Sequence, residues 1–220
     1  MKRVLVLRPE PGATATVEKA RALGLDAVAV PLFQVEAIDW EAPDAAAFDG
    51  LLLTSANAVR SGGEKLRSLR GLKAYAVGAA TAEAARQAGF DVAATGDAGV
   101  ERLLGSIEPD LKLLHLCGED RREPVEATQD ITRLTVYRAT PVENPDLAAA
   151  EGSIALIHSP RAGRRFAELA KTRAVRIAAI SAAAAEAVGD GWKKVAIAEQ
   201  PSDEALLALA ARLCNNSDPK

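Results

Sequence analysis

The chain has 220 residues, of which 49% are hydrophobic and 26% are charged, and its formal net charge at pH 7 is −3. This composition is typical of a globular protein with two lobes of ordinary size, and no apolar run approaches the roughly 20 residues that span a bilayer. The acidic balance argues against general nucleic-acid binding, which needs a basic surface, but it allows an anionic ligand in a locally basic cleft.

The start of the chain and its two cysteines indicate a cytoplasmic protein. The first residues run straight into a strand-like segment, without the architecture of a signal peptide. Cys117 and Cys214 have neither a CxxC nor a metal-binding spacing, so reduced thiols are the simplest interpretation. We expect a cytoplasmic protein with no membrane and no nucleic-acid partner and, since nothing points to an assembly, a monomer.

Short apolar runs alternate with helix-forming segments along the chain. Strands are predicted at 4–7, 27–30, 49–54, 72–77, 91–94, 111–116, 154–157, 176–180 and 194–197. Helices are predicted at 15–23, 55–69, 81–88, 100–107, 161–170, 182–188 and 203–213. Residues 118–124 form a predicted polar turn and residues 215–220 a polar tail. This alternation predicts the α/β class, with parallel sheets covered by helices on both faces.

The second half of the chain repeats the first at a nearly fixed offset. The matching segments are 52–59 with 156–163, 76–83 with 179–186, 100–104 with 203–207, and 3–10 with 112–119. Such self-similarity indicates one α/β unit built twice. Two similar lobes that face each other form a cleft, and we expect the ligand to bind there.

Two arrangements of the repeated blocks fit this pattern. A tandem arrangement divides the chain near Pro141. An interleaved arrangement pairs the first and last blocks and lets segments of alternating apolar and polar residues cross between lobes as an exposed ribbon. We favour the interleaved arrangement, with its parts at 1–34 and 142–220 (lobe 1), 39–133 (lobe 2), and 35–38 and 134–141 (connecting ladder).

Most familiar catalytic motifs are missing. The sequence has no GxGxxG, no Walker A segment and no HExxH, and its only histidines are His115 and His158. A histidine metal site is therefore not expected. His115 lies within a predicted strand, as a packed core residue would, whereas His158 follows a strand end, where it could meet a ligand or simply pack.

Small polar residues gather where strands meet helices. Open α/β sheets bind ligands at the carboxyl ends of their strands, and helix N-termini attract carboxylates. The candidates are Arg8, Pro9, Thr54, Ser55, Ala56, Asn57, Gly78, Ala79, Ala80, Thr81, Gly118, Ser159, Pro160 and Ser181. Any single serine or threonine among them could instead be an ordinary helix cap. Tyr137 ends a predicted crossing strand and could serve either as a weak acid or as packing at a strand edge.

These residues resemble the uroporphyrinogen-III synthase family over nearly the whole chain. The matching segments are Arg8-Pro9, Gly24, Pro31-Leu32, Leu53 to Val59, Val77 to Ala82, Val136-Tyr137, Ser159-Pro160, and Ala198 to Leu207. The resemblance implies two flavodoxin-like parallel-sheet lobes joined by a two-stranded antiparallel ladder. It also implies closure of hydroxymethylbilane to uroporphyrinogen III, with loss of water and inversion of ring D, and without cofactor or metal.

The resemblance also assigns roles to particular residues. It implies that Tyr137 and Thr81 are the candidates for helping the leaving hydroxyl, and that backbone N–H groups at the strand ends hold the acetate and propionate arms of a linear tetrapyrrole. We add the arginines near predicted strand ends as cationic candidates, namely Arg8, Arg121, Arg138 and Arg161.

The second repeat departs from the family, because Ser181 and Ala184 stand where glycine and threonine are frequent. A hydroxyl sometimes credited with ligand contact is therefore absent. This departure, together with His158, leaves open a non-catalytic module of the same fold that binds a small anion or a tetrapyrrole. A signalling receiver is disfavoured, because no acidic cluster follows a strand.

Overall fold

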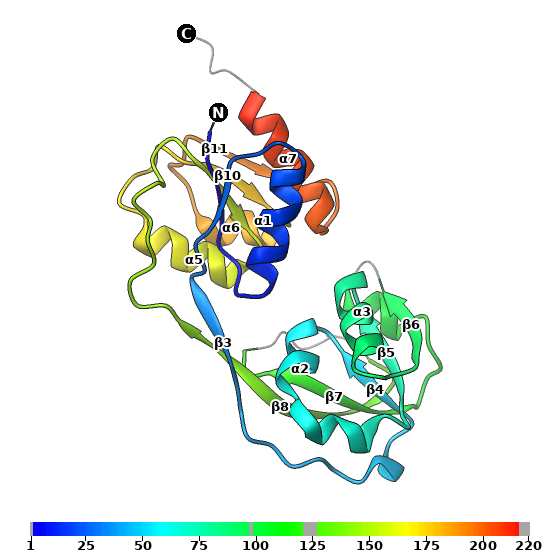
Figure 1. The fold of residues 1–220 in the computed structure, drawn as a ribbon. Helices are drawn as coiled ribbons and strands as arrows, with labels where there is room; N and C mark the ends of the chain where they lie inside the picture. Colours follow the sequence, from blue (N-terminus) through cyan, green and yellow to red (C-terminus); the bar gives the residue numbers. More distant parts are fainter. Residues whose placement is uncertain (1, 97–98, 121–126, 216–220) are drawn as a thin grey trace. The chain divides into compact units, whose positions relative to one another are not determined.

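The computed structural model describes residues 2–96, 99–120 and 127–215. The chain divides into two compact units, of which unit 1 comprises Met1–Gln34 with Pro141–Lys220 and unit 2 comprises Val35–Thr140. Each unit consists of a sheet with helices packed against it (Figure 1). Most of the predicted polar turn at 118–124 and most of the predicted tail at 215–220 lie outside the described residues.

Unit 1 is built on a five-stranded parallel sheet with the strand order β11-β10-β9-β1-β2. Its strands are β1 (Val4–Val6), β2 (Ala27–Ala29), β9 (Ile154–Ile157), β10 (Arg176–Ala179) and β11 (Lys194–Ile197). Every residue of β1 and β9 is buried, as expected for central strands of a parallel sheet that is covered on both faces. The first strand of the chain thus pairs with a strand of the second repeat.

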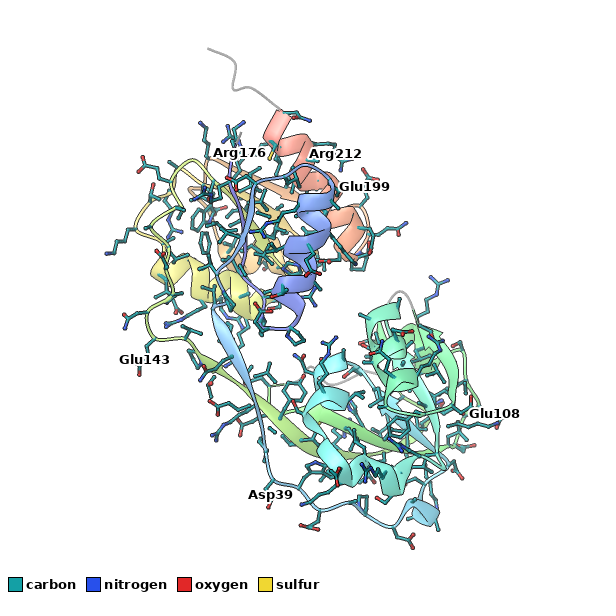
Figure 2. The ribbon with its side chains drawn as sticks, in the orientation of Figure 1. Asp39, Glu108, Glu143, Arg176, Glu199 and Arg212 are labelled. Carbon is teal, nitrogen blue, oxygen red and sulfur yellow. The ribbon has the colours of Figure 1, made fainter. Side chains whose placement is uncertain are left out.

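Among the described residues, four helices cover this sheet. They are α1 (Gly12–Ala22), α5 (Pro160–Leu169), α6 (Ala182–Val188) and α7 (Asp203–Asn215). Apolar residues of α1 and α7 form one core with Val4 and Val6, and α5 and α6 lie on the other side of the sheet (Figure 1). Charged side chains such as Glu199 and Arg212, which form an ion pair of 3.0 Å, lie at the surface of this unit (Figure 2).

Unit 2 contains most of a six-stranded sheet with the order β3-β8-β7-β4-β5-β6. Its strands are β3 (Phe33–Ala37), β4 (Gly50–Leu53), β5 (Lys73–Val77), β6 (Val92–Gly96), β7 (Lys112–Gly118) and β8 (Asp130–Pro141). The pairs from β8 to β6 are parallel. The arrangement of both sheets confirms the predicted α/β fold class.

The pairing of β3 with β8 runs antiparallel. Ile38 N donates to Val136 O and Val142 N donates to Leu32 O, each over 3.0 Å. As one segment advances along the chain the other recedes, which defines an antiparallel ladder. Most residues of both segments are exposed or only partly buried, in keeping with the half-exposed ribbon that the sequence predicts here.

Helices cover both faces of the unit 2 sheet. They are α2 (Ala56–Ser61), α3 (Ala79–Gln87) and α4 (Val100–Leu104), with 3-10 segments η1 (Ala45–Ala47) and η2 (Gly63–Leu69). Residues of α2, η2 and α3 pack with Leu51 and Leu53, whereas residues of α4 pack with Leu52. Neighbouring residues of β4 therefore face different cores, as the two-residue period of a strand requires.

The single helix predicted at 55–69 is wrong, because it breaks after Ser61 and continues as a 3-10 segment. Gly63 adopts a positive φ of 65°, which glycine tolerates without steric cost. The Gly62 carbonyl accepts a hydrogen bond of 3.1 Å from the buried Trp40 indole instead of continuing the helix. The helix predicted at 100–107 likewise ends early, at Leu104.

Candidate functional site

Two hydroxyl-bearing residues follow β4 in unit 2. Ser55 has extended backbone angles and caps α2, accepting a hydrogen bond of 3.2 Å from Asn57 N. Thr54 Oγ1 lies 2.9 Å from Nε2 of the buried His115, which reaches over from the neighbouring strand β7. His115 is thus buried, as the sequence indicates, yet it also orients a hydroxyl at the strand end. Ala56 and Asn57, the other candidates here, open the helix itself.

Tyr137 is seated against Gly118, the last residue of β7. The two residues are register partners, and the strand pairing shifts at this point. A Cβ at position 118 would lie 2.7 Å from Tyr137 Cζ and 2.9 Å from its phenol oxygen. Only glycine therefore lets the ring lie this close to β7. The predicted candidates Gly118 and Tyr137 are brought together, and the Ser55 hydroxyl interacts with the same phenol.

The surroundings of Tyr137 keep its phenol protonated. Burial raises the pKa of Tyr137 above its ordinary value, and the Ser55 hydroxyl opposes this shift only in part. The ring is nevertheless partly exposed to solvent. At neutral pH the group is therefore a hydrogen-bond donor and a weak acid that a ligand can reach.

The start of α3 carries the candidates Gly78, Ala79, Ala80 and Thr81. Gly78 has a φ of 83°, and the first turn closes through hydrogen bonds from Thr81 N and Ala82 N to Gly78 O. Ala79 and Ala80 are exposed, whereas Thr81 is 5% exposed and faces the interior of the unit. The backbone of this turn is thus more accessible than the Thr81 hydroxyl.

In unit 1 the corresponding serines are helix caps. Ser159 accepts from Ala162 N over 3.2 Å and Ser181 accepts from Ala184 N over 3.3 Å. Pro160 occupies the first turn of α5, a position that suits its fixed φ. These serines fit the capping interpretation of the sequence.

The arginine candidates have different surroundings. The Arg161 guanidinium lies 4.3 Å from the centroid of the Phe33 ring. Arg138 forms an exposed ion pair of 2.9 Å with Glu36 in unit 2. Arg121 lies outside the described residues.

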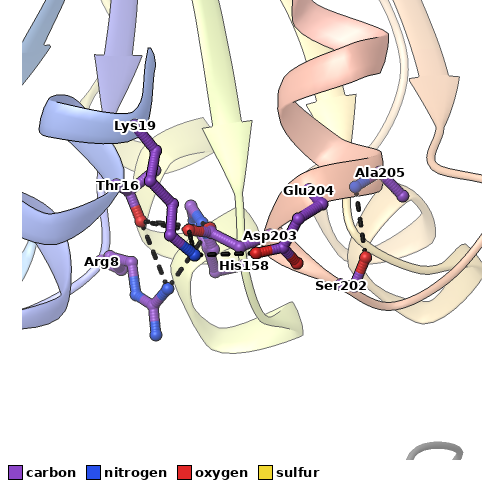
Figure 3. A network of polar contacts seen from close by, with 8 residues as sticks. All are labelled: Arg8, Thr16, Lys19, His158, Ser202, Asp203, Glu204 and Ala205. Atoms are coloured by element: carbon purple, nitrogen blue, oxygen red, sulfur yellow. Dashed lines mark hydrogen bonds and ion pairs between the residues drawn. The ribbon is translucent and has the colours of Figure 1, made fainter. Parts of the chain in front are cut away.

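Arg8 belongs to a polar network at the strand ends of unit 1 (Figure 3). Its Nη1 lies 3.3 Å from Thr16 Oγ1 and 3.4 Å from Asp203 Oδ1. His158 Nε2 lies 3.2 Å from the same carboxylate oxygen. Pro9, next to Arg8, accepts a hydrogen bond from Ala13 N through its carbonyl and so leads into α1.

The network fixes the charges of its members. Burial lowers the pKa of His158, against the opposing influence of Asp203, so the imidazole is neutral near pH 7. Burial works against ionisation of Asp203, but His158, the Arg8 charge and the Thr16 hydroxyl outweigh it and lower its pKa to about 2. Asp203 is thus a carboxylate at neutral pH.

Sequence reasoning missed Thr16, Lys19 and Asp203. Thr16 and Asp203 are far apart in the chain, and both look like ordinary helix residues. The available signal was an acidic residue in the first helical turn after a strand end, beside Ser202, which caps α7 through Ala205 N over 3.2 Å. That signal predicts a helix start but not a partner.

The described part of the chain shows neither a metal site nor a helix able to cross a membrane. Within residues 2–96, 99–120 and 127–215, no group of three or more His, Cys, Asp or Glu side chains could hold a metal ion. Over the same described ranges, no helix combines the length and the apolar character that a membrane crossing needs.

The structure is similar to solved structures of bacterial proteins. The structure resembles uroporphyrinogen-III synthetase from Helicobacter pylori, with a TM-score of 0.66 and 21% identity over 97% of this chain and 100% of that one. It also resembles a mutant uroporphyrinogen III synthase from Thermus thermophilus, with a TM-score of 0.54 and 19% identity over 98% and 100% of the two chains. At such low sequence identities, the structural similarity establishes only the fold of this chain.

The sequence itself identifies the family. A search of curated proteins gave no match. The family model described as "Uroporphyrinogen-III synthase HemD" matches residues 14–208, which is most of the chain. The chain therefore belongs to the uroporphyrinogen-III synthase family, the lyases that cyclise hydroxymethylbilane to uroporphyrinogen III in haem biosynthesis.

Proposed function

We propose that Tyr137 donates the hydrogen bond that helps the hydroxyl of hydroxymethylbilane to leave. The observation that supports this proposal is the position of the Tyr137 phenol. The ring lies against Gly118, the Ser55 hydroxyl interacts with the phenol, and burial keeps the phenol protonated. A pyrrole nitrogen lone pair expels the hydroxyl readily, so a weak acid within about 3 Å of that oxygen is sufficient.

The remaining work is orientation of the electrophile formed by loss of water. It must meet the substituted carbon of ring D instead of a free position, and that choice depends on how the chain is held. The absence of a conventional catalytic triad from the sequence agrees with a reaction that needs one weak acid and a shaped binding site.

The acetate and propionate arms of the substrate need anion-binding groups, and we propose candidates in each unit. We assign Arg8, Pro9, Ser159, Pro160, Arg161 and Ser181 of unit 1, and Thr54, Ser55, Ala56, Asn57, Gly78, Ala79, Gly118 and Arg138 of unit 2. Backbone N–H groups at the start of α3, where no side chain caps the helix, and the arginine guanidinium groups suit carboxylates. We also propose a monomer as the working enzyme, since no sequence feature points to an assembly.

Thr81 is proposed as a secondary donor. Its burial beneath the first turn of α3 means that it would act only after this turn rearranges, which is why we place it behind Tyr137. We also propose that the enzyme works in the cytoplasm, in keeping with the reduced thiols expected for Cys117 and Cys214, neither of which forms a disulfide within the described residues.

Steady-state kinetics with hydroxymethylbilane test this assignment. Tyr137→Phe keeps the ring but removes the donor, and we expect kcat to fall by about one to two orders of magnitude. Thr81→Ala should have a milder effect, and removal of an arginine charge should mainly raise KM. Unchanged kcat in Tyr137→Phe would reduce Tyr137 to a packing residue.

A further inference from the structure

The polar network of unit 1 joins side chains from four parts of the chain (Figure 3). Arg8 follows β1, Thr16 and Lys19 lie on α1, His158 follows β9, and Asp203 opens α7. Asp203 is the common partner of the other four side chains. The carboxylate is therefore the centre of the network, and its loss affects every contact.

Asp203 is held firmly. Both of its oxygens lie within hydrogen-bond reach of Thr16 Oγ1, at 3.1 and 3.0 Å, and His158 adds a contact of 3.2 Å. The Asp203 side chain is only 16% exposed, so water competes weakly for these contacts. Lys19 divides its ammonium between Asp203 and the exposed Glu204, at 3.7 and 2.8 Å. A carboxylate restrained in this way can act as a fixed point for another group.

Arg8 lies between this fixed point and solvent. Its guanidinium covers Gly12, where a Cβ would meet Nε at 2.7 Å and Cζ at 3.0 Å. Among the described residues, the hydrogen bonds of its side chain to Thr16 and Asp203 both use Nη1. The second terminal nitrogen is directed away from the network (Figure 3), and the side chain is 35% exposed. Arg8 thus has one nitrogen held inside and one available to a ligand.

We propose that Asp203 is a positioning residue that holds Arg8 so that its outward nitrogen receives a carboxylate arm of the substrate. The inference rests on the proposed role of Arg8 in substrate binding. A free arginine side chain loses rotamer freedom when it binds, whereas a guanidinium already fixed at Nη1 and over Gly12 has lost most of it. The preorganisation therefore lowers KM without touching the reacting atoms.

The test combines single and double variants in steady-state kinetics with hydroxymethylbilane. Arg8→Gln and Asp203→Asn should each raise KM by about tenfold while kcat stays near the wild-type value, because uniform binding is lost. If Asp203 acts through Arg8, the double variant should be no worse than Arg8→Gln alone. Asp26→Asn, which removes the exposed partner of Arg3 in the same unit, is the matched control and should leave KM unchanged.

The possible results separate the two proposals. If Arg8→Gln leaves KM unchanged, the binding role of Arg8 and the positioning role of Asp203 are both wrong. If Arg8→Gln raises KM but Asp203→Asn does not, or if the two effects add in the double variant, only the positioning role is wrong. If Asp203→Asn fails to fold, Asp203→Glu is the substitute variant. It keeps the charge but lengthens the side chain by one methylene, which displaces the Arg8 guanidinium. The same rise in KM is expected.

Discussion

The two units carry chemically different side chains at the ends of their strands. In unit 2 the residues after β4 are neutral hydroxyls, and Thr54 pairs with the buried His115. In unit 1 the position that repeats Thr54 is His158, which pairs with the carboxylate of Asp203 and so joins a network of charged groups. Each unit therefore pairs a histidine with a side chain near its strand ends, but His115 lies within β7 whereas His158 follows β9.

This difference suggests a division of labour between the repeats. Unit 2 presents a protonated phenol and hydroxyls, which suit the assistance of a leaving group. Unit 1 presents a partly exposed guanidinium on a mostly buried carboxylate, which suits the binding of anionic arms. In this proposal the two repeats share the strand–helix order but differ at a few strand-end positions, such as Thr54 and His158.

The largest effect is expected when the Tyr137 side chain is displaced from its position against Gly118. Gly118→Ala puts a Cβ at 2.7 Å from the ring, so the phenol must move. We expect a loss of about tenfold in kcat and a destabilisation of about 1–3 kcal/mol from overpacking. Gly71→Ala is the control in the same unit, because a Cβ there has no atom within 4 Å. Wild-type kcat in Gly118→Ala would mean that the placement of the phenol does not matter.

The charged network of unit 1 makes the stability of the folded protein sensitive to acid. Folding lowers the pKa of His158. As the pH falls below about 6.5, His158 is therefore protonated in the unfolded state before it is protonated in the folded state, and the free energy of unfolding decreases. Asp203, whose pKa is lowered to about 2, adds a stabilisation that is present above about pH 3.9 and is lost only at more acidic pH.

Thermal unfolding at pH 7.5 and pH 5.0 measures the histidine effect alone. His158→Gln retains a donor near the Nε2 position but cannot titrate, so its Tm should fall less than that of the wild type between the two pH values. The contribution of His115 is common to both proteins and cancels. Equal slopes in the two proteins would contradict a neutral, buried His158.

Substitutions at the helix caps should have smaller effects, which also distinguish the two units. Ser159→Ala and Ser55→Ala each remove an N-cap hydrogen bond, and each should cost about 1 kcal/mol of unfolding free energy. Only Ser55→Ala should also lower kcat, by a few-fold, because only Ser55 influences the Tyr137 phenol. A similar loss of kcat in Ser159→Ala would show that the two units do not differ in this way.

The smallest effect is expected at the surface of unit 2. Arg138 and Glu36 form an ion pair of 2.9 Å between side chains that are 52% and 35% exposed. Exposed pairs contribute about 0–1 kcal/mol, so Arg138→Gln should change Tm little. Arg8→Gln, measured beside it, should lower Tm more, because it leaves Asp203, whose side chain is only 16% exposed, with one partner fewer. The reverse order would contradict the assignment of the stronger network to unit 1.

The sequence predicts the fold well because the fold depends on local pattern. Buried runs such as those of β4 and β9 and the repeated strand–helix order define the parallel sheets without any knowledge of contacts. The break after Ser61 could not be predicted in the same way, because it depends on Trp40, which is distant in the chain. Gly62 and Gly63 were the only local signs of it.

Prediction of the site was less complete for the same physical reason. Gly118 and Tyr137 stand out because one ends a strand and the other is a rare aromatic residue, but their contact depends on the register of β7 and β8. Asp203 and Thr16 meet only through the packing of α1 and α7 on one sheet. Side-chain networks between helices distant in sequence leave no periodic trace.

The isomer composition of the product from hydroxymethylbilane is the most direct test of the account. The purified chain should yield uroporphyrinogen III in excess of the I isomer, which forms without enzyme, because the protein determines which carbon of ring D closes the macrocycle. A product that contains only the I isomer, at the rate of the uncatalysed reaction, would contradict the account.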